Sequence, residues 1–300
     1  MPLIRFRRAE LGALSMWCAA VVLLAARPVG AAGDAARGRV VFALAGGCGC
    51  HTSRDGPVGA GGGQVPTPFG TFYGTNITPD PDMGIGRWSD ADIEAAIRRG
   101  VVRGAGVESP AMPYYQYAGM ADQDVADLIA YLRSLPPVAR PNRPHSGEMP
   151  LARSAYRAWR WLFVRPATPP RAAPTAGDAR GRYLVNHVAI CGDCHTPRNW
   201  FGVPDAARYL AGAAHGPGGE AVPNITSHAT GIGEWSVDDV VSLLTTGMQP
   251  NFDNVQGLMA DVIDGTGGGP GYKHAPERDI RAIAEYVTAV PPIDNAVEAK

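Results

Sequence analysis

Hydrophobic side chains recur at helical spacing in two widely separated segments of the chain. They are Val125, Leu128, Ile129 and Leu132 in the first segment, and Ile280, Ile283 and Val287 in the second. A Pro-Pro pair follows each segment and ends the helical pattern, because proline lacks a backbone N–H and disfavours helical geometry in the residue before it. The pattern predicts two amphipathic helices, each closing a structural unit.

A third apolar stretch, from Leu11 to Ala26, has different surroundings. Three arginines precede it and the small residues Gly30-Ala31-Ala32 follow it, as in a secretory signal peptide. The stretch is shorter than the roughly 20 residues that span a bilayer comfortably. We expect residues 1–32 to be a signal peptide cleaved near Ala32 and the mature protein to be periplasmic. An uncleaved membrane anchor is the alternative.

The rest of the chain repeats itself. The shared motifs are Arg-Gly-Arg at 37–39 and 180–182, Asn-Ile-Thr at 76–78 and 224–226, and Gly-Ile-Gly-x-Trp-Ser at 84–89 and 231–236. This repetition predicts two units of one fold, residues 34–137 (the first unit) and 176–292 (the second unit). A Pro/Arg-rich linker, residues 138–175, joins them. The helical patterns and the repeat predict an all-α protein of two tandem domains. The 38 glycines and 27 prolines predict long irregular loops between its helices.

Both units carry the same signal for the start of a helix directly after the repeated tryptophan. Ser89 with Asp92, and Ser236 with Asp239, match a helix N-cap followed by an acid in the first turn. The matching positions support the alignment of the two units.

Four of the five cysteines lie in two motifs that place a histidine directly after a cysteine. In the second unit, Cys191-Gly-Asp-Cys194-His195 is the C-x-x-C-H pattern of covalent attachment of a c-type haem. Cysteines three apart share one face of a helical turn, so each thiol can form a thioether with one haem vinyl group. His195 can then ligate the iron. The fifth cysteine, Cys18, falls in the predicted signal peptide.

The first unit carries a shortened motif, Cys48-Gly49-Cys50-His51. Gly38 precedes Cys48 by 10 residues, as Gly181 precedes Cys191, so the missing residue lies between Cys48 and Cys50. Residues two apart on a helix point about 200° apart, which keeps the two thiols from reaching both vinyl groups in the usual manner. Two hypotheses remain open: the turn distorts and both thioethers form, or Cys50 alone is attached. In either case we expect His51 to ligate the iron.

Two methionines share one position in the repeat, Met112 and Met259, each 24 residues after the repeated tryptophan. Methionine often fills gaps in a core, but this shared register and the need for a sixth ligand favour the ligand role. Met248 competes for the second haem, although its counterpart in the first unit is Val101, which cannot ligate iron. His274 is a weaker candidate, since an insertion of about eight residues around 265–271 precedes it.

The charge balance and the motif pattern exclude several classes of protein. Without the four arginines and one glutamate of residues 1–32, the net charge is −4, and no basic stripe is present that would bind nucleic acid. A zinc site usually needs four convergent ligands in paired spacing, whereas each unit offers three adjacent ones. Disulfides suit an exported protein, but they do not explain a histidine after the last cysteine in both units.

Several further motifs resemble a known family. They are Thr67-Pro-Phe-Gly-Thr71, Asn76-Ile-Thr-Pro-Asp80, Gly84-Ile-Gly86 and Pro110-Ala-Met-Pro-Tyr114. They resemble the multihaem cytochrome c subunits of membrane-associated bacterial dehydrogenases of the alcohol and gluconate type. The resemblance implies Met112 and Met259 as axial ligands. The alcohol dehydrogenase subunits have three haem domains and this chain has two, and the shortened first motif also departs from the family pattern.

The expected function is therefore one-electron relay by a periplasmic dihaem cytochrome c. The resemblance implies a dehydrogenase, periplasmic or membrane-associated, as electron donor, and a quinone, an oxidase or a small cytochrome as acceptor. The alternative is a haem enzyme, such as a dihaem peroxidase, which needs an iron with an open or displaceable position. Histidine and methionine at both irons would fill all six positions, which favours the carrier.

Overall fold

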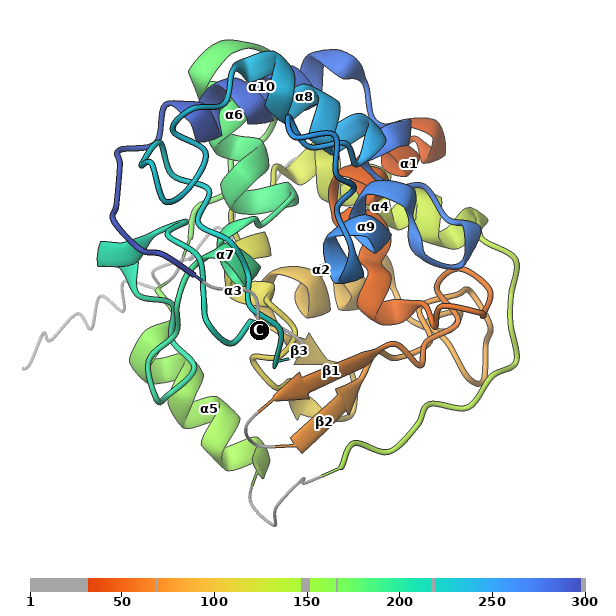
Figure 1. Cartoon of the computed structure of the whole chain (residues 1–300). Helices are drawn as coiled ribbons and strands as arrows, with labels where there is room; N and C mark the ends of the chain where they lie inside the picture. Colours follow the sequence, from red (N-terminus) through yellow and green to blue (C-terminus); the bar gives the residue numbers. More distant parts are fainter. Residues whose placement is uncertain (1–31, 68–69, 147–151, 166, 217–218, 298–300) are drawn as a thin grey trace, which may run out of the picture.

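A computed structural model describes residues 32–67, 70–146, 152–165, 167–216 and 219–297. The predicted signal peptide, apart from Ala32, lies outside the described residues. The protein is mainly α-helical, and the helices are joined by long irregular segments (Figure 1). In the described part of the chain, no helix is both long and apolar enough to cross a bilayer.

The first unit contains four helices, one 3₁₀ segment and two short ribbons. In chain order they are α1 (Ala35–Leu44), η1 (Gly46–His51), β1 (Gln64–Thr67), β2 (Gly70–Tyr73), α2 (Asp90–Arg99), β3 (Val101–Val102), β4 (Gly106–Val107), α3 (Tyr114–Tyr117) and α4 (Asp122–Ser134). Strands β1 and β2 form one antiparallel ribbon, and β3 and β4 form the other. Helix α1 packs against α4, so the first and last helices of the unit are neighbours.

The second unit follows a similar path, and its described residues form no strand ribbon. After α5 (Ala152–Phe163) in the linker come α6 (Gly177–Tyr183), the π-helical turn η2 (Leu184–Val188), α7 (Gly192–His195), η3 (Ala206–Arg208), α8 (Val237–Thr246), α9 (Gly257–Asp264), η5 (Thr266–Gly268), η6 (Tyr272–His274) and α10 (Glu277–Thr288). Helix α10 packs against both α6 and α8 at the top of Figure 1. All seven apolar residues that predicted the closing helices are buried in α4 and α10.

The repeated Arg-Gly-Arg motif marks a close helix crossing in both units. A Cβ on Gly38 would lie 1.9 Å from the carbonyl oxygen of Asp127, and one on Gly181 would lie 2.2 Å from that of Ala282. The preceding arginine reaches a buried aspartate of the closing helix: Arg37 Nε lies 2.7 Å from Asp127, and Arg180 Nε lies 2.9 Å from Asp279. In each unit the glycine of the motif therefore lets the first helix approach the last one closely, and the preceding arginine holds the two helices together by an ion pair.

The predicted helix starts are confirmed. Ser89 and Ser236 are the N-caps of α2 and α8, and each forms a full capping box with the aspartate three residues on. The repeated glycines that end these helices, Gly100 and Gly247, adopt left-handed backbone with φ of 57° and 80°. Glycine adopts this conformation without the steric penalty that a Cβ brings.

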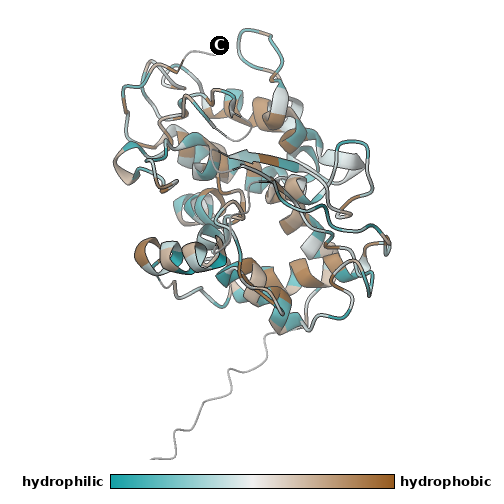
Figure 2. Cartoon of the chain, turned by 90° about the horizontal axis from the view of Figure 1, so that it is seen from below, coloured by the Kyte–Doolittle hydropathy of each residue, from teal (hydrophilic) through white to brown (hydrophobic). Residues whose placement is uncertain are grey.

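The two units share one hydrophobic core, to which α1, α2 and α4 contribute together with α6, α8 and α10. The helices of the molecule carry both hydrophobic and hydrophilic residues (Figure 2). Buried Tyr183 of α6 joins the units, because its hydroxyl accepts the Ala121 N–H at 2.9 Å and donates to Asp124 at 2.7 Å. The units are therefore packed into one body.

The segment between the units is attached to the first of them. Asn142 accepts the Asn76 N–H at 2.7 Å, and His145 accepts the Tyr73 N–H at 3.1 Å. Helix α5 leaves several large apolar side chains exposed next to an exposed loop of the second unit: Trp161, Leu162 and Phe163 on the helix, and Trp200 and Phe201 on the loop. The predicted boundaries at residues 137 and 292 stay predictions, since contacts with each unit continue beyond both.

Candidate haem-binding sites

The second motif forms a helical turn, as its spacing predicts. The π-helical extension of α6 ends at Val188, and Ile190, two residues later, has a left-handed φ of 45°. The chain then turns through α7, where the backbone N–H of His195 donates to the carbonyl of Cys191 at 2.9 Å. This bond sets Cys191, Cys194 and His195 on one turn.

The first motif forms a distorted turn. Within η1, Gly47 and Cys48 have left-handed φ values of 66° and 45°. For a residue with a Cβ, this conformation costs roughly 1–2 kcal/mol. The shortened spacing is thus accommodated by the backbone at Cys48, and Cys50 and His51 follow in the last turn. The distortion is the one that the first hypothesis requires, and it leaves the number of thioethers open.

Both histidines are held in the same way. His51 Nδ1 lies 2.8 Å from the Thr75 carbonyl oxygen, and His195 Nδ1 lies 2.8 Å from the Pro223 carbonyl oxygen. Because a carbonyl oxygen only accepts, Nδ1 carries the proton and the lone pair remains on Nε2. Burial lowers the pKa of both imidazoles, although the carbonyl bonds oppose this. Both rings are thus neutral and present Nε2 as a metal ligand.

The two carbonyls belong to the repeated Asn-Ile-Thr loops, which explains that motif. The side-chain oxygens of buried Asn76 and Asn224 each accept two hydrogen bonds from the threonine two residues later, one from its N–H and one from its hydroxyl. The side-chain amide of each asparagine donates to a backbone carbonyl just after the Pro-Pro pair of its own unit. The acceptors there are the Val138 carbonyl and the Ile293 carbonyl, both at 2.8 Å. Each loop is therefore locked by the end of its own unit.

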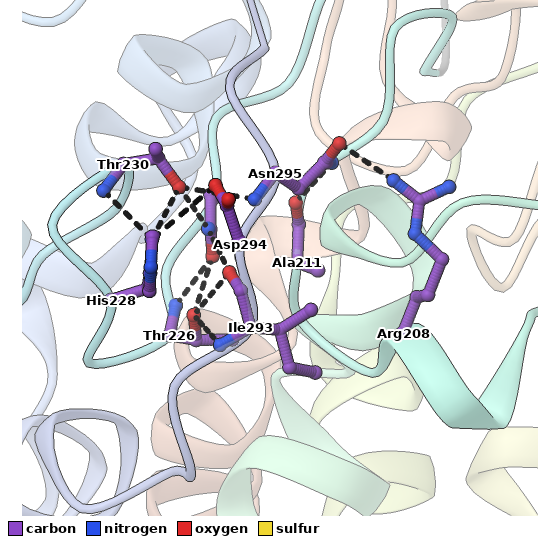
Figure 3. A network of polar contacts seen from close by, with 9 residues as sticks. Arg208, Ala211, Thr226, His228, Thr230, Ile293, Asp294 and Asn295 are labelled. Carbon is purple, nitrogen blue, oxygen red and sulfur yellow. Dashed lines mark hydrogen bonds and ion pairs between the residues drawn. The ribbon is translucent and has the colours of Figure 1, made fainter.

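The end of the second unit extends this network. Asn295 accepts from Arg208 at 2.6 Å and donates to the Ala211 carbonyl at 2.6 Å, and its backbone N–H donates to Thr230 at 3.1 Å (Figure 3). Ile293 N–H donates to Thr226 at 3.2 Å, and Val138 N–H makes the same bond to Thr78 in the first unit. Residues after 292 thus help to hold the loop behind His195.

All four cysteines of the motifs are free thiols in this structure. Burial raises the pKa of Cys48 and of Cys191 to about 12 and that of Cys50 to about 11. Cys50 nevertheless keeps exposed surface, and the other three are half-buried. Among the described residues, no group of three or more histidine, cysteine, aspartate or glutamate side chains is placed to hold a metal ion by itself.

The cysteines of the two motifs lie near each other. Burial raises the pKa of Cys194, and the charges of Asp193 and of Cys50 in the other motif raise it further. Two tyrosines lie beside the motifs, Tyr117, which is half-buried, and Tyr272, which is buried. Burial raises the pKa of Tyr117, and the neighbouring Cys48 and Cys50 raise it further. Burial likewise raises the pKa of Tyr272, and Cys191 and Cys194 add to that rise.

These tyrosines are equivalent once the insertion before Tyr272 is allowed for. Tyr117 follows Met112 by five residues, and Tyr272 follows Met259 by thirteen, eight of which match the insertion. The repeat places these two tyrosines at matching positions, but each unit contains several tyrosines and the sequence does not single out this one.

The predicted methionine ligands lie in half-buried positions. Met112 precedes α3, where its N–H donates to the Ser109 carbonyl at 3.1 Å, and Met259 lies in the first turn of α9 against the core. Met248 is 42% exposed. His274 is exposed, and its Nδ1 accepts the Gly271 N–H at 3.3 Å. Met112 and Met259 as sixth ligands stay predictions.

The insertion of the second unit covers the first motif. A Cβ on Gly47 would lie 2.9 Å from the Pro270 carbonyl oxygen, and one on Gly49 would lie 3.1 Å from the Thr266 hydroxyl. On the other side, a Cβ on Gly74 would lie 1.7 Å from the Cys50 carbonyl oxygen, so only glycine fits there. The first motif is therefore enclosed between its own unit and residues 265–270.

The residues fit a c-type haem. Neutral imidazoles with a free Nε2 suit iron, thiols beside them suit thioether formation, and each histidine is braced through its other nitrogen, as metal-ligating histidines are. His51 with Cys48 and Cys50, and His195 with Cys191 and Cys194, would hold the group. The fold and these residues define a haem-binding protein of c type.

Comparison with known proteins gives the family. The cytochrome c family model matches residues 35–136. A diheme cytochrome c-type protein of Cereibacter sphaeroides is 40% identical over 272 residues, which make up 88% of each chain. The chain belongs to the c-type cytochromes, whose haem is covalently bound, and the sequence resemblance is confirmed.

Two other relatives are parts of dehydrogenases. The cytochrome c subunit of the alcohol dehydrogenase (quinone) of Gluconobacter oxydans is 36% identical over 86% of this chain and 55% of its own length. The gluconate 2-dehydrogenase cytochrome c subunit of Pantoea cypripedii is 36% identical over 83% of this chain and 58% of its own length. The chain spans little more than half of these two subunits. Like them, it is an electron-transfer protein rather than a catalytic subunit.

Proposed function

We propose that the chain is a periplasmic dihaem cytochrome c of two tandem cytochrome c domains, which relays single electrons from a dehydrogenase to a respiratory acceptor. One haem is attached to Cys191 and Cys194 with His195 and Met259 as iron ligands. The other is attached to the first motif, through Cys50 alone or through Cys48 and Cys50, with His51 and Met112 as ligands. When bound, each haem supplies an iron that takes up and releases one electron.

The identical support of the two histidines carries this proposal. Both Nδ1 atoms lie 2.8 Å from the carbonyl that precedes an Asn-Ile-Thr loop. The same brace in both units favours a haem in both, because histidines that ligate a metal are held through their other ring nitrogen. The first motif thus keeps the machinery of iron ligation although its cysteine spacing is shortened.

The packing of the units supports transfer between the two sites. Cys50 and Cys194 lie within electrostatic reach of each other, and the units share one core. Groups attached to these cysteines are therefore held in a fixed relation, which suits a relay.

The sequence and the relatives support the location and the partner. The basic N-terminus followed by an apolar stretch is typical of export. Relatives named as cytochrome c subunits of alcohol and gluconate dehydrogenases favour a dehydrogenase as donor. A quinone, an oxidase or a small cytochrome is the acceptor we expect; no nucleic-acid partner is expected.

The first test is the intact denatured mass of the protein, exported in a host with haem-attachment machinery. Two added haems are expected. One added haem would overturn covalent attachment in the first unit. The absorption spectrum of the native protein would then separate a non-covalent haem from a structural copy without haem, and the second of these would overturn the dihaem proposal.

Single-cysteine variants test the attachment of the first haem. Cys48→Ala should keep both haems, because its thiol lies on the distorted turn, whereas Cys50→Ala should lose one. Cys191→Ala is the matched control, since it leaves the second haem on a single thioether and shows the absorption band of a haem with one intact vinyl group. Loss of a haem in Cys48→Ala would contradict attachment through Cys50 alone.

A further inference from the structure

Asp193, within the second haem motif, is the centre of a polar cluster. Its side chain is 19% exposed and accepts the Tyr115 hydroxyl at 3.0 Å, the Gln116 side-chain amide at 2.8 Å and the Arg198 guanidinium. Arg198 also donates to the Tyr115 hydroxyl at 2.9 Å and to the Asp193 carbonyl at 3.0 Å. The carboxylate and the guanidinium thus form one pair, and Tyr115 bridges them.

This cluster joins the two haem sites. Tyr115 and Gln116 belong to α3 of the first unit and follow its predicted iron ligand, Met112, by three and four residues. The ring of His187 in the second unit donates to the Gln116 carbonyl at 3.0 Å beside the cluster. The segment that carries the first unit's methionine is therefore fastened directly to the second unit's motif.

Asp193 lies beside parts of both haem sites. It directly precedes Cys194 in the second motif, and its hydrogen bonds to Tyr115 and Gln116 hold its carboxylate against the segment that follows Met112 in the first unit. The residue before Cys50 in the first motif is Gly49, so Asp193 is the single acidic residue in the sequences of the two motifs. Charges in such a partly buried place are screened less than charges on the surface.

We propose that Asp193 and Arg198 are positioning residues that fix the two haem motifs relative to each other and balance the charge beside both, so that each member of the pair shifts both haem potentials. This inference rests on the proposed dihaem function.

The signs of the shifts follow from electrostatics. Ferric haem carries one more positive charge than ferrous haem, so a nearby negative charge lowers the reduction potential and a positive one raises it. Asp193→Asn keeps an oxygen that can accept from Tyr115 and Gln116 but leaves the Arg198 charge unbalanced. Arg198→Gln leaves the Asp193 charge unbalanced. The first variant should raise both potentials, and the second should lower both.

The exposed pair Asp238–Arg281, 3.0 Å apart on α8 and α10, offers matched controls. Redox titration of the full haem-loaded chain, followed by absorbance, should show opposite shifts of both haems in Asp193→Asn and Arg198→Gln. The double variant should return toward the original potentials, and Asp238→Asn and Arg281→Gln should leave both unchanged.

Shifts of the same sign in the two single variants would mean that the cluster acts through structure alone and would overturn the inference, as would the absence of any shift. Intact mass separates this outcome from failure of the proposed function. If the unmodified chain carries fewer than two haems, the dihaem function fails. If it carries two and the signs agree, only the role of the pair fails.

Discussion

The two haem motifs differ in their cysteines and agree in what holds their histidines. In the first, Gly47 and Cys48 take left-handed backbone. In the second, a regular turn follows one left-handed residue, Ile190. Yet each histidine is braced by a carbonyl at 2.8 Å. The support of the histidine is therefore separable from the cysteine spacing, because the loop that orients the histidine is the same in both units.

The surroundings of the motifs differ as well. Residues 265–270 of the second unit cover the first motif, whereas Asp193 fastens the second motif to α3 of the first unit. Each motif is thus partly surrounded by residues of the other unit, so we expect a change in one unit to alter the surroundings of both motifs.

The largest expected effect comes from removing either braced histidine. His51→Ala and His195→Ala should each convert one haem from low spin to high spin, so that about half of the low-spin absorbance is lost, because each iron loses one axial ligand. His215→Ala, which removes an exposed ring outside the motifs, is the control and should leave the spectrum unchanged. A normal spectrum in His51→Ala alone would show that the first site does not ligate iron.

A smaller effect distinguishes the two helix crossings. Arg180 is 15% exposed and its partner Asp279 is 4% exposed, so Arg180→Ala leaves a buried carboxylate unpaired and should cost about 3–5 kcal/mol of unfolding free energy. Arg37 is 56% exposed, and Asp127 keeps bonds from the Asp34 N–H and the Gln123 amide. Arg37→Ala should therefore cost less. Urea unfolding of the haem-loaded variants measures both, and equal losses would contradict the difference in burial.

The smallest effect should be the same in both units. Ser89→Ala and Ser236→Ala each remove an N-cap and should cost about 1 kcal/mol. Hydrogen bonds from the serine side chain and then its backbone lower the pKa of Asp92 and of Asp239. A lowered pKa stabilises the fold above the ordinary value of 3.8, and this stability is lost as the pH falls through the lowered value. Thermal unfolding at pH 7 and pH 3 should show less acid sensitivity in either variant than in the unmodified chain.

The sequence predicted the elements whose signals are local. The closing helices, the capping boxes at Ser89 and Ser236 and the register of the two motifs all follow from spacing. The ion pairs to Asp127 and Asp279 could not be predicted, because a charged residue within a helix normally faces solvent, and only the close crossing at Gly38 and Gly181 buries them.

The brace of each histidine was equally hidden. Its acceptors are backbone carbonyls at Thr75 and Pro223, and a carbonyl has no signature in the sequence. The repeat showed that Asn-Ile-Thr was shared, but not that the atom in use belongs to the residue before it. The cover over the first motif is a contact between units, and an insertion present in one copy gives no indication of where it lies.

That enclosure has a consequence for the order of events during biogenesis. Gly74 lies against the carbonyl of Cys50, and residues 265–270 close the motif from the other unit. Those last residues are made some 200 positions later in the chain. The first motif therefore gains this side of its surroundings only after the second unit has been made and has packed against it.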